Sequence, residues 1–227
     1  MTTHRTTFGP GSILAIGTLI AATMGCGPGG AVAPTPTSTP TPTSTPAPTP
    51  RPSGPWPIVT GRLDAGSYTT TAFVPKFTFT LPAGWHALFE DDSDEMAIEG
   101  GDGDLLYITR PTEVIDTKTG LYVATPGDLV AWLGSHPSLT TAPPVPVVVS
   151  GIASRYVDVL SVDKAEVTFF HYETGNMHFG AGLRLRIYVV PLDGVDLVII
   201  VGAPDAGFAD LAGRAKTIVE SMKIATS

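Results

Sequence analysis

A proline-rich tract from Pro34 to about Pro55 constrains the fold of this chain most, because it cannot contribute to a hydrophobic core. The tract repeats the unit Pro-Thr-Pro-Thr-Ser-Thr, in which proline recurs every few residues and hydrophobic side chains are nearly absent. This composition favours extended polyproline II structure at about 3.1 Å per residue, so roughly 22 residues reach on the order of 70 Å. We therefore predict a stalk over residues 26–55 and a folded domain over residues 56–227. The threonines and serines of the stalk are acceptors for O-linked sugars, and an unmodified spacer fits the composition at least as well.

Residues 1–25 have the pattern of a bacterial lipoprotein signal peptide. A basic start at His4 and Arg5 leads into an apolar run from about residue 13 to residue 24. That run has about a dozen residues, well short of the roughly 20 that span a membrane. Thr23-Met24-Gly25 in front of Cys26 resembles the lipobox of lipoprotein signal peptidase, although leucine is more usual in place of Thr23. The pattern predicts cleavage before Cys26, its acylation with palmitate, and a lipoprotein anchored at the extracytoplasmic face of the cell membrane.

Two alternatives for the N-terminus remain open. Cleavage after Ala31-Val32-Ala33 would give a secreted protein, although Pro34 directly after this site disfavours the ordinary signal peptidase. Without any cleavage, the apolar run would itself serve as an anchor.

The chain is acidic, which excludes some classes of partner. It has 13 Lys and Arg against 21 Asp and Glu, a formal net charge of −8, and removal of residues 1–25 takes away only Arg5, which changes the charge to −9. Nucleic acids and anionic lipid surfaces require clustered basic residues, so we expect neither as a partner. Cys26 is the only cysteine, so an intrachain disulfide is impossible and the fold must depend on its apolar interior.

From residue 56 onward the chain can bury roughly two thirds of its surface, so we expect one domain. Asp193-Gly194 predicts a two-residue type I′ turn, and Thr125 with Pro126 predicts the start of a short helix that ends at His136-Pro137. A second helix is expected over residues 208–222. Together these elements predict an α+β fold with a largely antiparallel sheet packed by two or more helices. Periodicity predicts strands at about residues 77–81, 96–98, 105–108, 145–149, 156–162, 165–172, 183–190 and 195–201.

The segment Phe79-Thr80-Leu81-Pro82-Ala83-Gly84-Trp85, with the closing strand and helix at the C-terminus, resembles the PsbP-like superfamily. That group includes LpqN-type lipoproteins of actinobacteria and other poorly characterised surface lipoproteins. The resemblance covers most of residues 60–225 and is distinctive at its two ends. It implies an α/β/α sandwich around an antiparallel sheet and a usually non-enzymatic role, exercised through partners or small ligands. It carries over no active-site residue, because proline, glycine and the indole of Trp85 act in the fold.

His171, Glu173 and His178 are the best candidates for a site. If Thr174-Gly175 forms the turn of a hairpin, His171 lies directly opposite His178 and Glu173 shares their face. Two imidazoles and a carboxylate can bind Zn²⁺ or another divalent ion, although structural zinc sites normally have four protein ligands. An exposed polar hairpin face is the simpler explanation.

An acidic cluster suggests calcium, because hard oxygen ligands suit that ion. Met96 stands where an EF-hand requires an oxygen ligand or glycine, so solvated turns explain the cluster better. The cluster consists of Glu90, Asp91, Asp92, Asp94, Glu95, Asp102 and Asp104.

Hydrolase signatures such as Gly-x-Ser-x-Gly and His-Glu-x-x-His do not occur in the sequence. His86 and His136 stand beside Trp85 and Pro137 in expected turns, which predicts surface histidines. We therefore expect a lipid-anchored extracytoplasmic lipoprotein, without a cofactor, whose domain binds an envelope protein or a small ligand such as a lipid or glycan. The alternative is a cell-envelope hydrolase with an active site assembled from distant residues.

Overall fold

The computed structural model describes residues 51–56, 60–91, 93–162, 166–172 and 175–225. The chain from Thr49 to Ser227 forms one compact unit. The predicted signal peptide, Cys26 and nearly all of the predicted stalk lie outside the described residues.

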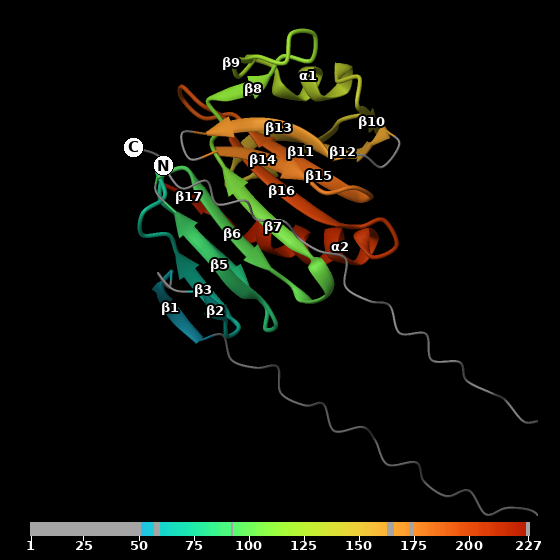
Figure 1. The fold of residues 1–227 in the computed structure, drawn as a ribbon. Helices are drawn as coiled ribbons and strands as arrows, with labels where there is room; N and C mark the ends of the chain where they lie inside the picture. The colour runs from blue at the N-terminus through green and yellow to red at the C-terminus, as the bar shows by residue number, and fades with distance from the viewer. Residues whose placement is uncertain (1–50, 57–59, 92, 163–165, 173–174, 226–227) are drawn as a thin grey trace, which may run out of the picture. The chain divides into compact units, whose positions relative to one another are not determined.

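A nine-stranded antiparallel sheet forms the centre of this unit (Figure 1). Both of its faces are covered, which explains why its middle strands are almost continuous apolar runs. In order across the sheet, the strands are β10 (Leu139–Thr141), β12 (Ile152–Ser161), β15 (Leu183–Val190), β16 (Leu197–Pro204), β7 (Leu105–Thr109), β6 (Glu95–Glu99), β5 (His86–Asp91) and β2 (Gly61–Arg62), and β11 (Val145–Val149) also pairs with β12.

The side chains of β16 alternate between two hydrophobic cores on opposite faces of this sheet. Leu197, Ile199 and Val201 belong to the first core, whereas Val198 and Ile200 belong to the second. Each of them has an exposed fraction of 0 %. The strand therefore contributes apolar surface to both sides, as expected where successive side chains point to opposite faces.

The first core is covered by α2 (Phe208–Ser221) and a second sheet. The buried side chains of α2 recur at helical spacing, and Trp85 enters this core with an exposed fraction of 1 %, as predicted. The second sheet contains β1 (Arg51–Pro55), β3 (Gly66–Thr69), β4 (Phe77–Leu81) and β17 (Lys223–Ile224), in that order. Its β1–β3 pair is parallel and its other pairs are antiparallel.

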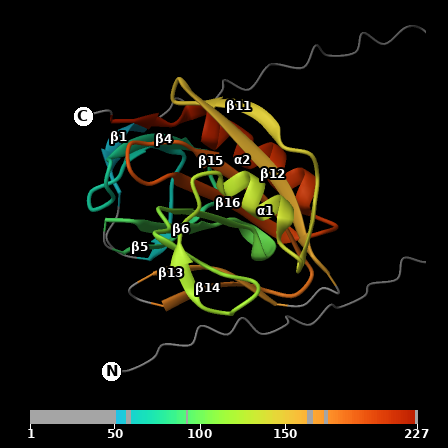
Figure 2. The same ribbon diagram turned by 90° about the horizontal axis from the view of Figure 1, so that it is seen from above.

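The second core is covered by α1 (Leu129–Ser135) and a third sheet. In order, the third sheet contains β14 (Gly175–Phe179), β13 (Val167–Tyr172), β8 (Glu113–Ile115) and β9 (Tyr122–Ala124), all antiparallel. Figure 2 shows α2 and the β13–β14 hairpin on opposite sides of the central strands. A short 3-10 helix, η1 (Gly101–Gly103), connects β6 to β7.

The predicted α+β class with mostly antiparallel pairing is confirmed by these sheets and helices. β4 and β15 have the predicted bounds, and α2 ends one residue before the predicted end. β4 alternates between apolar residues and threonine, and β15 alternates at first and then ends in an apolar run. Such patterns are strong indicators of a strand.

Three local predictions differ from the structure. Residues 51–55, predicted as the end of the stalk, form β1 and pair with β3. The β15–β16 hairpin forms, but residues 191–196 make a longer loop, and Asp193 does not adopt a type I′ turn because Ser150 is the only described non-glycine residue with positive φ. α1 begins at Leu129 with Asp128 as its N-cap, rather than at Thr125-Pro126.

Candidate functional site

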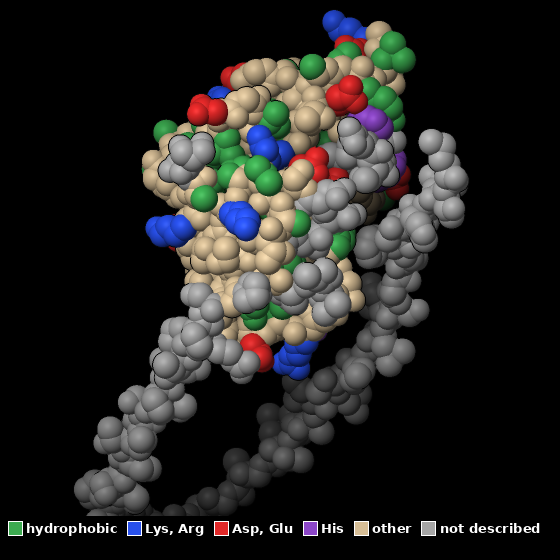
Figure 3. Space-filling view, turned by 90° about the vertical axis from the view of Figure 1, so that its left-hand side faces the viewer, with side chains coloured by type: hydrophobic (Ala, Val, Ile, Leu, Met, Phe, Trp, Pro, Cys, Tyr) green, Lys and Arg blue, Asp and Glu red, His purple; other side chains and the backbone are tan. Residues whose placement is uncertain are grey.

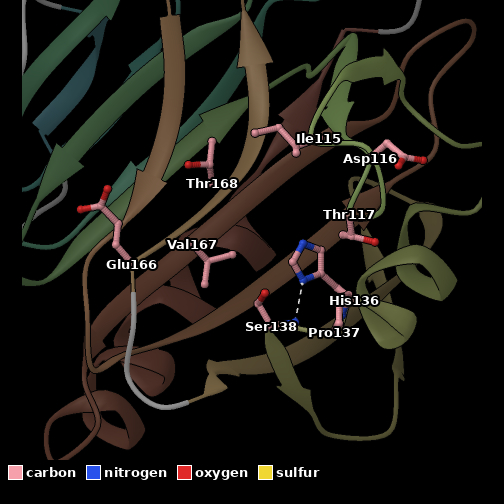
Figure 4. Close-up of a pocket in the computed structure, with 10 residues that line it drawn as sticks. Ile115, Asp116, Thr117, His136, Pro137, Ser138, Glu166, Val167 and Thr168 are labelled. Atoms are coloured by element: carbon pink, nitrogen blue, oxygen red, sulfur yellow. Dashed lines mark hydrogen bonds between the residues drawn. The ribbon is translucent and has the colours of Figure 1, made fainter.

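A hollow with a volume of about 330 Å³ opens on the described surface at the margin of the second core (Figure 4). It is lined by residues 115–117 and Gly120 at the end of β8 and in the loop that follows, residues 136–138 after α1, and residues 166–168 at the start of β13. These distant segments meet because β13 pairs with β8 while α1 packs on the same core. The volume lies near the lower end of the roughly 300–1,000 Å³ typical of small-molecule sites.

His136 is the most buried titratable side chain of this hollow, with an exposed fraction of 6 %. Its ring lies nearly perpendicular to those of Trp132 and Phe169, with centroids 5.2 and 5.6 Å away. The backbone N–H of Ser138 donates a hydrogen bond to Nδ1 of His136 at 3.2 Å. Figure 4 shows the other ring nitrogen, Nε2, on the side of the ring that faces the hollow.

Burial lowers the pKa of His136, because a charged imidazolium would lose its hydration among the aromatic rings. The ring is therefore neutral at pH 7. Because Nδ1 accepts a hydrogen bond, the proton of the neutral ring is on Nε2. Among the described residues, none hydrogen-bonds to Nε2. His136 thus presents an N–H donor to the hollow.

The prediction that His136 is a surface residue is wrong, because the end of α1 packs its ring against Trp132. One sequence signal could have indicated this contact: Trp132 and His136 are four residues apart, and side chains at that spacing share a helix face. The contact with Phe169 of β13 depends on the tertiary fold and has no such signal. His86 is exposed as expected, although it lies on β5 and not in a turn.

Two carboxylates, Asp116 and Glu166, flank the hollow at opposite ends in Figure 4. Oδ1 of Asp116 accepts hydrogen bonds from the N–H and hydroxyl groups of Thr119 and from the N–H of Lys118, at 2.8, 2.9 and 2.9 Å. These donors, the N–H of Thr119 foremost, lower the pKa of Asp116, so it is ionised at pH 7. Within the described part of the chain, none of the residues that line the hollow is Lys or Arg.

Elsewhere, side chains of both charges are interspersed with apolar ones, as the face in Figure 3 shows. The charges that line the hollow act at shorter range than those of this face and bear more directly on which ligands it accepts.

The predicted pairing of His171 with His178 is wrong. In the β13–β14 hairpin, His171 lies opposite Asn176, whereas Thr168 lies opposite His178. Tyr172 pairs with Gly175, which the prediction placed in the turn, and this sets the partner of His171. Farther from the turn, a β-bulge between Thr168 and Phe170 places an extra residue on β13.

His171, which lies on β13, an inner strand of the third sheet, has its own partners. Its ring stacks on Tyr122 of β9 with centroids 3.9 Å apart, and its Nε2 lies 3.8 Å from Oε2 of Glu113. Glu173 lies outside the described residues, and within the described part of the chain no group of three His, Cys, Asp or Glu side chains has a metal-binding arrangement. Metal binding by His171, His178 and Glu173 stays a prediction.

Thr168, His178 and Glu166 bring a hydroxyl, an imidazole and a carboxylate together beside the hollow. Oγ1 of Thr168 lies 2.8 Å from Nδ1 of His178, and Oε1 of Glu166 lies 3.4 Å from the same nitrogen. In a catalytic triad the hydroxyl and the carboxylate contact opposite ring nitrogens, so that the ring takes the proton from the hydroxyl while the carboxylate orients it. With both partners at Nδ1, this arrangement does not have the geometry of a triad.

The acidic cluster is only partly described: Asp92 lies outside the described residues, as do the side chains of Glu90, Asp91 and Asp102. Asp104 forms an ion pair with Arg214 of α2, and its side chain is 10 % exposed. This carboxylate therefore has a structural partner. Calcium binding by the cluster stays a prediction.

Neither of the two α-helices in the described part of the chain has the length and hydropathy to cross a bilayer. No protein-family model matches the chain, and no curated protein does.

Several solved structures are similar to this chain. CyanoP, the cyanobacterial PsbP of Synechocystis sp. PCC 6803, is 9 % identical over 75 % of this chain and 95 % of its own, with a TM-score of 0.38. LpqN, involved in cell envelope biogenesis of Mycobacterium tuberculosis, is 12 % identical over 74 % and 91 %, with a TM-score of 0.34. A protein of Bacteroides thetaiotaomicron VPI-5482 is 13 % identical over 66 % of this chain, with a TM-score of 0.36, and the chain spans 46 % of its length. A PsbP protein and LpqN, the two kinds of protein that the sequence resembles, are thus both among these similar structures.

Proposed function

We propose that this protein is a lipid-anchored extracytoplasmic lipoprotein whose α+β domain binds a small ligand, without catalysis, in the hollow around His136. The anchor is acylated Cys26, and the proline-rich tract holds the domain away from the membrane. In this proposal the two helix-covered faces of the central sheet make the domain an α/β/α sandwich of the PsbP-like type. If the lipobox is not processed and Cys26 is not acylated, the same domain is secreted.

One observation carries the binding role: a buried, neutral imidazole directs a hydrogen-bond donor into a hollow of ligand size. The described buried side-chain atoms that lack a hydrogen-bond partner do not include Nε2 of His136, so solvent reaches this donor through the hollow. An acceptor on a bound ligand would take the place of that water. Binding sites typically combine an apolar lining with a few such convergent polar groups.

A small ligand is favoured over the other expected roles. A hydrolase requires a nucleophile with a base in reach, and the imidazole contacts of Thr168 and Glu166 do not supply that geometry. A flat surface of a partner protein would not reach a hydrogen-bond donor that lies inside a hollow. We therefore also favour a small ligand over an envelope protein.

One experiment tests both parts of the proposal. The full-length chain is expressed in a bacterium with labelled palmitate and purified from membranes in detergent, and co-purifying small molecules are identified by mass spectrometry. We expect label on the wild type but none on Cys26→Ser, which should be recovered without membranes. We also expect a small molecule with the wild type that is absent from His136→Phe. An unlabelled wild type would overturn the anchor, and identical molecules with both proteins would overturn the binding site.

A further inference from the structure

The charges at the His136 hollow disfavour an anionic ligand. Ionised Asp116 and the exposed Glu166 flank it, and none of the described residues that line it is Lys or Arg. An anion in the hollow would lose hydration, meet two negative charges and gain no cationic partner from the described lining residues. Phosphorylated and carboxylated ligands therefore fit poorly.

A cationic ligand does not fit the centre of the hollow either. The group directed inward, Nε2–H of His136, is a donor, and an ammonium group has donors but no acceptor. Glu166 is 65 % exposed at its side chain and Oδ1 of Asp116 already accepts three hydrogen bonds, so neither carboxylate supplies a desolvated partner for a cation.

An uncharged polyhydroxylated ring satisfies the lining groups. Its hydroxyl oxygens accept from Nε2–H of His136, and its hydroxyl protons can be donated to the side-chain oxygen of Ser138 or to exposed Glu166. Ile115 and Val167 give the hollow an apolar wall for the C–H face of such a ring. Hydroxyl groups both donate and accept, which matches a site where a fixed donor lies beside acceptors.

We propose that the hollow binds an uncharged mono- or disaccharide, with a ring hydroxyl oxygen accepting the hydrogen bond from Nε2 of His136. This assignment of the ligand class rests on the proposed function, in which the hollow is a binding site.

The test is titration calorimetry of the full-length chain in detergent with named sugars. Glucose, mannose and N-acetylglucosamine are the neutral probes, and glucuronate and glucosamine are the charged ones. We expect saturable binding of at least one neutral sugar, with both charged probes weaker by about ten-fold or more. A charged probe that binds as tightly, or no neutral sugar that binds, would overturn the sugar assignment.

Variants connect the binding to named residues. His136→Phe keeps a ring but removes both nitrogens and should weaken the neutral sugar by about ten-fold, whereas His136→Gln retains a donor near Nε2 and should lose less. Near-ultraviolet circular dichroism checks that each variant is folded. Because Glu166 is exposed, Glu166→Lys leaves the core intact; it should raise glucuronate affinity relative to the neutral sugar. An unchanged ratio in a folded Glu166→Lys protein would count against the charge argument.

The proposed function and the sugar assignment fail in different ways. A co-purifying molecule that depends on His136 but is not a sugar would leave the binding role intact and overturn the ligand class. The absence of any His136-dependent molecule, together with no sugar binding, would overturn both.

Discussion

The burial of His136 follows from its neighbours on two elements. Trp132 contacts the ring from α1 and Phe169 contacts it from β13, while the N–H of Ser138 satisfies one ring nitrogen. No contact of this ring favours a positive charge, so desolvation determines its protonation. The hydrogen-bonding character of the hollow is thus set by packing.

The free energy of unfolding should depend on pH through His136. The pKa of this side chain is about 6.5 in an unfolded chain, and burial lowers it in the folded one. As the pH falls below about 6.5, the unfolded chain takes up the proton first, so the free energy of unfolding decreases until the pH passes the folded-state value. The loss is about 1.4 kcal/mol for each pKa unit between the two states. We expect His136→Phe to lack this contribution.

Urea unfolding near pH 8, near pH 7 and near pH 5.5 measures the effect in the wild type and in His136→Phe. Between the two higher values the ring is neutral in both states, so the change with pH should be the same in the two proteins there. Profiles that remain parallel down to about pH 5.5 would show that His136 is not the group responsible.

At the scale of single elements, α1 shows how a tertiary contact can displace a predicted cap. Thr125 has the right type for an N-cap, but its hydroxyl donates to the carbonyl of Pro111 at 2.8 Å and its N–H donates to the carbonyl of Thr112 at 2.9 Å. These bonds continue the β8–β9 ladder past β9. The helix begins three residues later than expected, where Oδ1 of Asp128 accepts the N–H of Ala131 at 3.0 Å.

We expect Asp128→Ala to lower the free energy of unfolding by about 1 kcal/mol, because the first turn of α1 loses its side-chain acceptor. Asp128→Asn is the matched control. It keeps a capping oxygen and loses only the charge opposite Arg155, in a pair whose side chains are about half exposed, so its loss should stay below about 0.5 kcal/mol. Chemical denaturation measures both. A loss in Asp128→Asn as large as in Asp128→Ala would assign the effect to the ion pair.

The predictability of each element follows the strength of its burial pattern. β4 and β15 were predicted because their side chains alternate or remain apolar against a core. β9 and β10 were missed because each has three residues and no buried side chain: those of β9 are exposed, and two of the three in β10 are half-buried. A segment this short has too few residues for a periodicity that would distinguish a strand from a loop.

The candidate site was less predictable than the fold. The three segments of the hollow are brought together by pairings between distant residues, which the sequence does not show. The predicted opposition of His171 and His178 failed because Tyr172 pairs with Gly175, a residue that the prediction placed in the turn, so His171 faces Asn176. A turn that is misplaced by one residue along the chain changes the partner of every residue in the strands that follow it.

At the scale of the whole unit, Arg214 joins the C-terminal helix to the first half of the domain. Its guanidinium pairs with Asp104, just after η1, and also contacts Asp210 one turn earlier in α2 at 3.0 Å. The same group lies 5.8 Å above the ring of Trp85. The helix is thereby attached to the β6–β7 connection by charge as well as by its apolar face.

We expect Arg214→Met to lower the free energy of unfolding by about 1–2 kcal/mol, because Asp104 would keep its shielded position without a partner. Arg214 is 40 % exposed, so the loss should be smaller than for a fully buried pair. Lys216→Met is the control, since Lys216 and Glu220 form an exposed pair on the same helix, 3.1 Å apart, and its loss should be within about 0.5 kcal/mol. If urea denaturation showed the same loss in the free energy of unfolding for both variants, the pair of Arg214 with Asp104 would stabilise the domain no more than an exposed ion pair does.

The alternation of β16 between two cores has a consequence for how the domain can change in length. Adding one residue within the strand would turn every later side chain to the opposite face of the sheet. Side chains that pack in the first core would then enter the second, and the reverse. Conservative replacements within Leu197–Pro204 disturb one interior at a time, whereas an insertion there disturbs both together. Gain and loss of residues in descendants of this chain will therefore concentrate in connections such as 191–196, and the middle of the sheet will keep its length.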